Sequence, residues 1–196
     1  MLVKKVLMSS LLVSMMTIAG IASADVSFVK TTDGSALKID SGLFDTPAAK
    51  EFLATGKNSY VGNAEATAKG KKIFGLYSCT QCHGGDAKGQ VGPGLVGPTF
   101  RYPKDATNKG MFETIWAGTN GGMGAKGIGL MDATDPKNGV TVDELLKVIA
   151  WIRTQGSGGV TGNEEFKKYL DNFWKILKNH SCIITVVVFY CLYLRK

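Results

Sequence analysis

The pentapeptide Cys79-Thr80-Gln81-Cys82-His83 is the feature that most constrains this chain. Two cysteines separated by two residues and followed at once by histidine form the attachment site of a c-type heme. The thiols add to the vinyl groups of the porphyrin, and the adjacent histidine becomes an axial ligand of the iron. We therefore predict one covalently bound heme c, attached through Cys79 and Cys82 and ligated by His83.

The same cysteine spacing occurs in thiol-redox pairs and in zinc sites. A redox pair does not require the histidine, and a zinc site needs two further ligands nearby. The other histidine is His180, and the remaining cysteines, Cys182 and Cys191, lie far downstream. The pattern therefore favours heme over both alternatives.

The first residues carry the signals of export. Two lysines precede an apolar run over residues 6–21, and Ala22-Ser23-Ala24 fits the cleavage site of a signal peptide. The run is short for an uncleaved membrane anchor, and a polar segment follows it. We therefore predict a signal peptide over residues 1–24 and a periplasmic protein.

The charge of the chain says little about its partners. The formal net charge of +7 falls by two when Lys4 and Lys5 are removed with the signal peptide. There is no arginine-rich or aromatic-interleaved patch, so nucleic-acid binding is not expected. A modest basic excess suits solubility, and it can also orient the protein on an acidic partner. Candidate charges around the heme edge are Lys88, Lys104 and Lys126.

Helices joined by long loops are expected rather than strands. Many of the 25 glycines fall between Gly84 and Gly139, where apolar alternation is scarce. Start and stop signals predict four helices. They begin at Pro47, at Ala64, near Lys109 and after the capping box at Thr141, and they end near Gly56, Tyr77, Ala117 and Gly156. The second of these helices is expected to run directly into the heme motif. We expect an all-α domain over 63–156, preceded by an extension over 25–62.

With these elements, the chain resembles the cytochromes c that hold a single heme between histidine and methionine. In that family the helix before the heme motif crosses the C-terminal helix, and Gly70, Phe74 and Trp151 match the contact residues. The loop Gly92-Pro93-Gly94-Leu95-Val96-Gly97 matches the family pattern G-P-x-L-x-G. The resemblance implies the cytochrome c fold. It also implies that the Pro93 carbonyl accepts a hydrogen bond from His83 and raises its basicity.

The sixth iron ligand is expected to be a methionine. The family places it after a G-T-like turn upstream of the last helix, and Gly118 to Gly124 fits, so Met123 is the candidate. Spacing alone leaves Met131, in the same loop, as the alternative. A thioether ligand raises the reduction potential and fills the last position on the iron. We therefore expect an electron carrier rather than an enzyme; the alternative is a heme enzyme subunit with an open iron site.

A closer resemblance extends over about Asp33 to Arg153. The segments 45–58, 102–107, 117–124 and 147–153 resemble cytochrome c(L), the periplasmic electron acceptor of quinoprotein (PQQ) methanol dehydrogenase in methylotrophic bacteria. The longer loop through Met131 and Pro136 resembles the branch that accompanies lanthanide-dependent methanol dehydrogenases. The resemblance implies electron transfer from this dehydrogenase to another cytochrome c or an oxidase, in methanol metabolism. The alternative is a general cytochrome c that serves another dehydrogenase.

The C-terminus does not fit that family. Residues 163–178 can form an amphipathic helix, and residues 183–194 are almost wholly apolar but shorter than the ~20 residues that cross a bilayer. We interpret this atypical tail, within 157–196, as a sequence artefact such as read-through, because unpaired cysteines and exposed apolar residues are liabilities in an oxidising compartment. A partial membrane anchor is the alternative.

Overall fold

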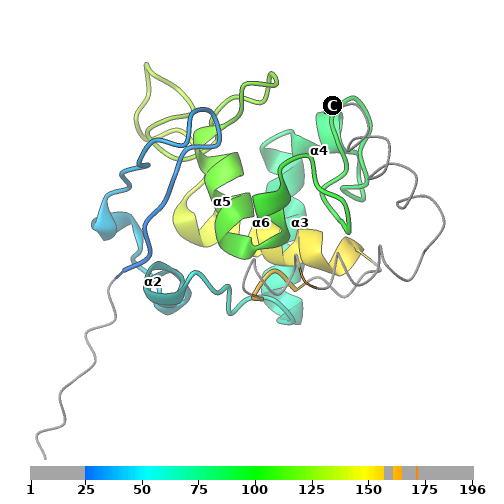
Figure 1. Ribbon diagram of the computed structural model, residues 1–196, viewed down its shortest axis with the longest axis horizontal. Helices are drawn as coiled ribbons and strands as arrows, with labels where there is room; N and C mark the ends of the chain where they lie inside the picture. The colour runs from blue at the N-terminus through cyan, green and yellow to red at the C-terminus, as the bar shows by residue number, and fades with distance from the viewer. Residues whose placement is uncertain (1–24, 157–160, 165–170, 172–196) are drawn as a thin grey trace, which may run out of the picture.

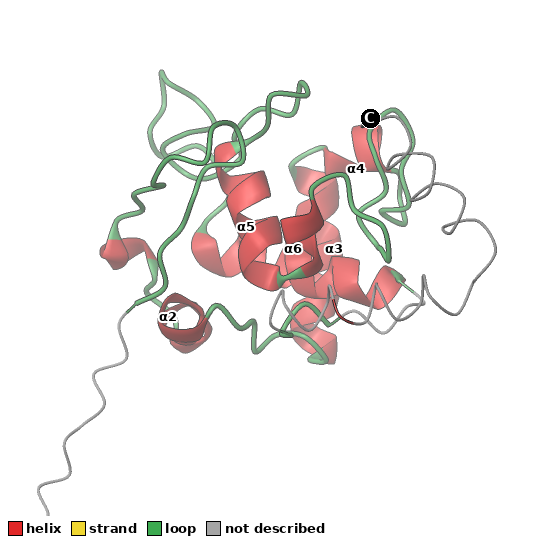
Figure 2. Ribbon diagram, in the orientation of Figure 1, coloured by secondary structure: helices red, strands yellow, loops and turns green. Residues whose placement is uncertain are grey.

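The structure is a computed structural model that describes residues 25–156, 161–164 and 171. The predicted signal peptide and nearly all of the predicted C-terminal helix and apolar tail lie outside these residues. The described elements are helical: η1 (Ser41–Leu43), α2 (Pro47–Thr55), α3 (Ala64–Leu76), α4 (Cys79–His83), η2 (Pro103–Ala106), α5 (Asn108–Ala117) and α6 (Val142–Gln155). Long loops connect them, with isolated bridges at Val29–Ala36 and Gly127–Val140 (Figures 1 and 2).

Side-chain caps start the four longer helices at the positions that the sequence predicts. The Thr46 hydroxyl accepts the Ala49 N–H at 3.2 Å before α2, and the Asn63 side chain accepts the Ala66 N–H at 2.9 Å before α3. Each cap satisfies a backbone donor that the first helical turn leaves unpaired. Thr107 caps α5, and a complete capping box joins Thr141 and Glu144 at the start of α6. The predicted helices are confirmed within a residue or so at their ends.

One expected continuity is wrong. The helix before the heme motif does not run directly into it, because α3 ends at Leu76 and Ser78 adopts a left-handed conformation with φ 57°. The chain therefore turns between the two helices, and the motif residues form the separate short helix α4. The new direction sets the orientation of His83 at the end of α4.

The centre of the molecule is the crossing of α3 and α6 (Figure 1). A Cβ on Gly70 would lie 2.0 Å from the carbonyl oxygen of Lys147, so only glycine permits this approach of the two backbones. One turn further along α3, the ring of Phe74 lies 4.6 Å from that of Trp151, centroid to centroid, at 49°. This tilted packing is a favourable arrangement for buried aromatic rings, and it confirms the predicted contact.

The segment before α3 belongs to the same core. Phe28, Leu37 and Phe44 are buried in one cluster with the residues of α5 and α6. The ring centroid of Phe28 lies 5.8 Å from that of Phe52 on α2 and 5.5 Å from that of Phe112 on α5. The boundary at residues 62 and 63 thus stays a prediction, while the two parts share one hydrophobic core. Within the described part of the chain, no helix has both the length and the apolar character needed to cross a membrane.

Candidate heme site

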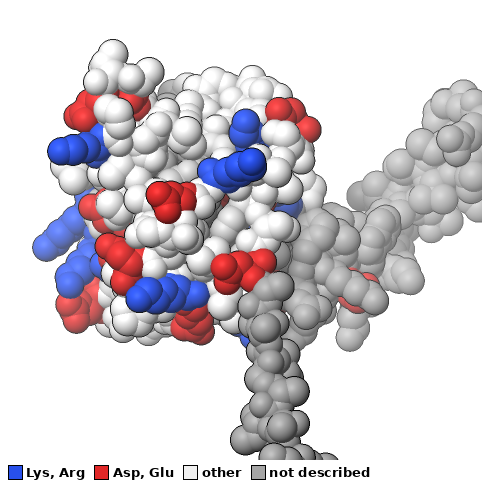
Figure 3. Space-filling view, turned by 90° about the vertical axis from the view of Figure 1, so that its left-hand side faces the viewer, with Lys and Arg blue, Asp and Glu red and all other residues white. Residues whose placement is uncertain are grey.

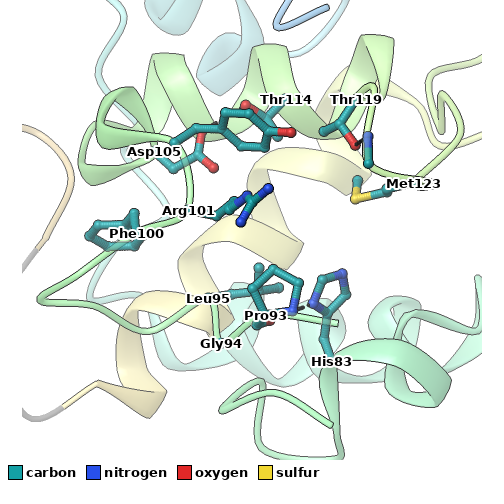
Figure 4. A pocket seen from close by; sticks show the side chains of 12 residues that line it. His83, Pro93, Gly94, Leu95, Phe100, Arg101, Asp105, Thr114, Thr119 and Met123 are labelled. Atoms are coloured by element: carbon teal, nitrogen blue, oxygen red, sulfur yellow. Dashed lines mark hydrogen bonds between the residues drawn. The ribbon is translucent and has the colours of Figure 1, made fainter. Parts of the chain in front are cut away.

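A cavity of about 350 Å³ opens beside α4, which is within the range of about 300–1,000 Å³ typical of ligand sites. Figure 4 shows that segments far apart in the sequence meet around it. It is lined by His83, Pro93, Gly94, Leu95, Phe100, Arg101, Tyr102, Asp105, Thr114, Thr119, Gly121 and Met123. The cavity therefore joins the heme motif, the loop after it and the loop after α5.

The orientation of His83 is fixed by a backbone acceptor. Its Nδ1 lies 2.8 Å from the carbonyl oxygen of Pro93, and the residue is 8% exposed. A carbonyl can only accept, so Nδ1 carries the proton and donates it. The other ring nitrogen, Nε2, then keeps its lone pair free, which is the form of imidazole that binds a metal.

The loop that carries Pro93 is fastened to α4 by its own backbone. The Gly92 N–H donates to the Cys82 carbonyl at 2.7 Å, and the Gly89 N–H donates to the His83 carbonyl at 2.9 Å. A third bond joins the Leu95 N–H to the Ala87 carbonyl at 2.8 Å. The Pro93 carbonyl is therefore held in place independently of anything bound in the cavity.

Met123 and Met131 differ in their position relative to this cavity. Met123 lines it, and Figure 4 shows its side chain across the space from the His83 ring. Met131 lies eight positions further along the loop and is not among the lining residues. The geometry thus favours Met123 over Met131 as the partner of His83.

The two cysteines of the motif occupy the first and fourth positions of α4. Cys79 is half-buried and Cys82 is exposed. Burial raises the pKa of the Cys79 thiol, whereas reactive redox cysteines have a lowered pKa. Among the described residues, no group of three or more His, Cys, Asp or Glu side chains gathers in a way that could hold a metal ion. Neither the thiol-redox nor the zinc alternative gains support.

Comparison with known proteins gives the same assignment. A sequence model of the cytochrome c family matches residues 67–156. Cytochrome c-L of Methylorubrum extorquens is 38% identical over an alignment of 172 positions, which covers 78% of this chain and 81% of the relative. This chain belongs to the cytochrome c-L family. As a member of that family, it is a c-type cytochrome that carries covalently bound heme c and acts as an electron carrier.

Two solved structures are similar to this chain. Cytochrome cL from the marine methylotrophic bacterium Methylophaga aminisulfidivorans is 32% identical, with a TM-score of 0.59 over 74% of this chain and 92% of that one. Cytochrome cL from Hyphomicrobium denitrificans is 42% identical, with a TM-score of 0.56 over 66% of this chain and 73% of that one. The predicted cytochrome c fold is thereby confirmed.

The polar wall of the cavity was not expected from the sequence. Asp105, in η2, accepts a hydrogen bond from the Thr114 hydroxyl of α5 at 2.7 Å, and Arg101 lines the same space. Arg101 and Asp105 lie just before and within the short helix η2, and Thr114 lies on α5; no periodicity or spacing in the sequence marks any of them. Only the resemblance over 102–107 pointed to this segment, and it gave Asp105 no role.

Asp105 is a buried carboxyl group, 6% exposed. Burial raises its pKa from 3.8 to about 7, although the Thr114 hydrogen bond and the charges of Lys104 and Arg153 act in the opposite direction. Arg153 of α6 donates through Nη2 to the backbone carbonyl of Asp105 at 2.8 Å and through Nε to Asn108 at 3.0 Å. Helix α6 therefore holds this wall of the cavity in position.

Two of the three candidate rim lysines form ion pairs with acidic side chains of the same molecule. Lys104 forms an ion pair at 2.8 Å with the buried Glu113 of α5, so its charge is balanced by a carboxylate of the same molecule. Lys88 pairs with Asp86 at 3.2 Å on an exposed loop.

On the face that carries the N-terminal extension, acidic and basic side chains are interspersed (Figure 3). This face therefore presents no patch of a single sign.

Proposed function

We propose that this protein carries single electrons from a PQQ-dependent methanol dehydrogenase to a downstream cytochrome or oxidase in the periplasm. The partner is suggested by membership of the cytochrome c-L family and by the likeness to a cytochrome cL from a methylotrophic bacterium. The signal peptide that the sequence predicts supports the periplasmic location.

In this proposal Cys79 and Cys82 attach the heme, and His83 and Met123 ligate its iron. The heme, when bound, supplies one-electron chemistry at the iron. Pro93 keeps His83 in the tautomer that can ligate and makes it a stronger ligand. The Met123 thioether, as the second ligand beside His83, would raise the reduction potential and would leave no position on the iron for a substrate.

The observation that carries the proposal is that His83 and Met123 line one cavity from opposite sides (Figure 4). A heme enzyme needs an open position on the iron, whereas an electron carrier works with both axial positions filled. The arrangement therefore favours outer-sphere electron transfer over catalysis.

The surface beside the attachment site suits a brief encounter with a large partner. Leu76, at the end of α3, is 75% exposed, and Val91 is 85% exposed. Leu76 lies three positions before Cys79, and Val91 precedes Gly92, whose N–H donates to the Cys82 carbonyl. Apolar side chains in a small interface, with charges around it, are typical of transient redox partners.

The direct test is reduction of the ferric protein by the methanol dehydrogenase of the same organism in the presence of methanol. We expect heme reduction that is much faster than the reduction of an unrelated cytochrome c and that changes with salt concentration. Reduction no faster than that of the unrelated cytochrome would contradict the proposed donor. Reduction that depends on another alcohol dehydrogenase would point to the general carrier instead.

A further inference from the structure

The N-terminal extension forms a hairpin, residues 29–36, whose base is fixed to α5. Its strand-like arms meet at the Val29–Ala36 bridge, and the Lys30 N–H donates to the Ser35 carbonyl at 2.8 Å. The Val29 N–H donates to Glu113 at 3.0 Å, and Phe28 packs in the core next to it. Because the buried Glu113 carboxylate and the buried Phe28 ring anchor this hairpin, it can restrain the loops that it contacts.

The hairpin reaches the loop that carries Met123. The side-chain amide of Asn120 donates to the backbone carbonyl of Thr32 at 2.7 Å, across 88 positions in the sequence. The hydroxyl of the preceding hairpin residue, Thr31, shares a hydrogen bond of 2.9 Å with the hydroxyl of Thr114. Thr114 in turn donates to Asp105 in the cavity wall. The extension thus contacts both the methionine loop and the wall beside it.

The methionine loop, residues 118–126, is otherwise anchored on α5. It begins at Gly118, where φ is 76° and a Cβ would lie 2.8 Å from the Met123 carbonyl. The Thr119 N–H donates to the same carbonyl at 2.8 Å, and the Lys126 N–H returns to the Ile115 carbonyl at 3.1 Å. Asn120 stands between these two anchors and ties the outer part of the loop to the extension.

We propose that the hairpin is a strap that holds the methionine loop closed over the heme cavity, with Asn120 as its positioning residue. The proposal rests on the assignment of Met123 as the axial ligand. A thioether is a weak, neutral ligand on a loop, so its residence on the iron depends on how often the loop opens. A hydrogen bond from the loop to the fixed hairpin lowers the population of the open loop.

The test measures loop opening with imidazole, which binds ferric heme iron only when methionine has left it. The holoprotein variant Asn120→Ala removes the donor, and Asn120→Asp removes it at nearly unchanged size, since a carboxylate cannot donate. A net hydrogen bond of this kind changes an opening equilibrium by about threefold to tenfold, and apparent imidazole affinity should rise by the same factor. Thr32→Ala is the matched control, because its bond to Asn120 uses the backbone carbonyl.

We expect tighter imidazole binding in both Asn120 variants and wild-type imidazole affinity in Thr32→Ala. The thermal unfolding midpoint should stay close to that of the wild type in all three variants. Unchanged imidazole affinity in both Asn120 variants would overturn the strap. An equal rise in Thr32→Ala would overturn it as well, since the effect would then not depend on the bond between the Asn120 amide and the Thr32 carbonyl. Met123→Leu should bind imidazole most tightly, and wild-type affinity in that variant would refute the role of the loop. None of these results depends on the methanol dehydrogenase, so the donor can be wrong while the strap stands.

Discussion

The carbonyl oxygen of Lys147 on α6 faces the α carbon of Gly70 on α3 so closely that a Cβ there would stand 2.0 Å from it. The backbone of Val148 lies 3.0 Å from the same point. These are backbone atoms in the middle of a helix, so they cannot move aside as a flexible side chain can. The crossing of α3 and α6 therefore depends on the absence of a side chain at residue 70.

Gly70→Ala should accordingly destabilise the protein. Overpacking against backbone in a helix crossing costs about 1–3 kcal/mol, and we expect the upper end of this range because neither helix can yield. The free energy of unfolding, measured by urea titration of the holoprotein, gives the value. Gly75→Ala is the control: it lies in the same helix, no atom comes within 4 Å of its Cβ, and it should gain about 0.5–1 kcal/mol. Equal losses in the two variants would show that the crossing is not tight.

The ligand assignment predicts different spectra for substitutions at the two loop methionines. Met123→His should lower the reduction potential strongly and abolish the weak near-infrared band that ferric iron shows with a methionine ligand, because imidazole stabilises the ferric state relative to a thioether. Met131→Leu should leave both the band and the potential nearly unchanged, since residue 131 does not line the cavity. The opposite pattern would move the ligand to Met131.

The helices were predictable from the sequence because residues close in the chain determine where each helix begins and ends. Thr46, Asn63 and Thr141 are side chains that cap the helix that follows them, and these short-range bonds form wherever the residues occur in that order. The heme motif was predictable for a similar reason, since thioether attachment fixes the cysteine spacing and places His83 next to it. The Phe74–Trp151 contact was found through the family resemblance rather than through a local pattern.

The contacts of the extension were not predictable. Phe28, Leu37 and Phe44 pack against helices that follow them far along the chain, and nothing local distinguishes them from surface residues of a linker. The same is true of Asn120 and Thr32, whose bond depends on how two loops happen to meet. Asp105 lies in the cavity wall because η2 turns it inward, and a single carboxylate in a loop gives no signal of burial. The turn at Ser78 was missed because serine seldom adopts a positive φ.

Asp105 should make the stability of the protein depend on pH. Its pKa in the folded state, about 7, lies above the ordinary value of 3.8, so between these values the folded state holds a proton that the unfolded state releases. The stability gained from this proton on Asp105 is fully present below about pH 4, and it is lost as pH rises through about 7. Asp105→Asn cannot ionise, so its free energy of unfolding relative to wild type should improve between pH 5 and pH 8, by an amount on the order of a few kcal/mol.

Urea unfolding of the wild-type and Asp105→Asn holoproteins at the two pH values measures this change. Asp132→Asn serves as the control, because hydrogen bonds from Thr134 lower the pKa of that exposed carboxyl group, and its substitution should bring no gain at higher pH. A difference between wild type and Asp105→Asn that does not vary with pH would mean that Asp105 is ionised throughout this range.

Val91 offers the sharpest test of the proposed docking surface. It is 85% exposed beside the loop that fastens to α4, so Val91→Glu places a charge in an interface without disturbing the core. The rate of heme reduction by methanol dehydrogenase should fall by roughly tenfold, the size of effect that a central apolar contact has in an interface. The reduction potential should stay the same, because the ligands and the bond between His83 and Pro93 are untouched. Leu130→Glu is the matched control: Leu130 is also an exposed apolar residue, 49% exposed, but it belongs to the loop between α5 and α6 rather than to the loop that fastens to α4, and its substitution should leave the rate unchanged. If both variants slowed reduction equally, the effect would reflect overall charge, and the partner would have to approach another part of the surface.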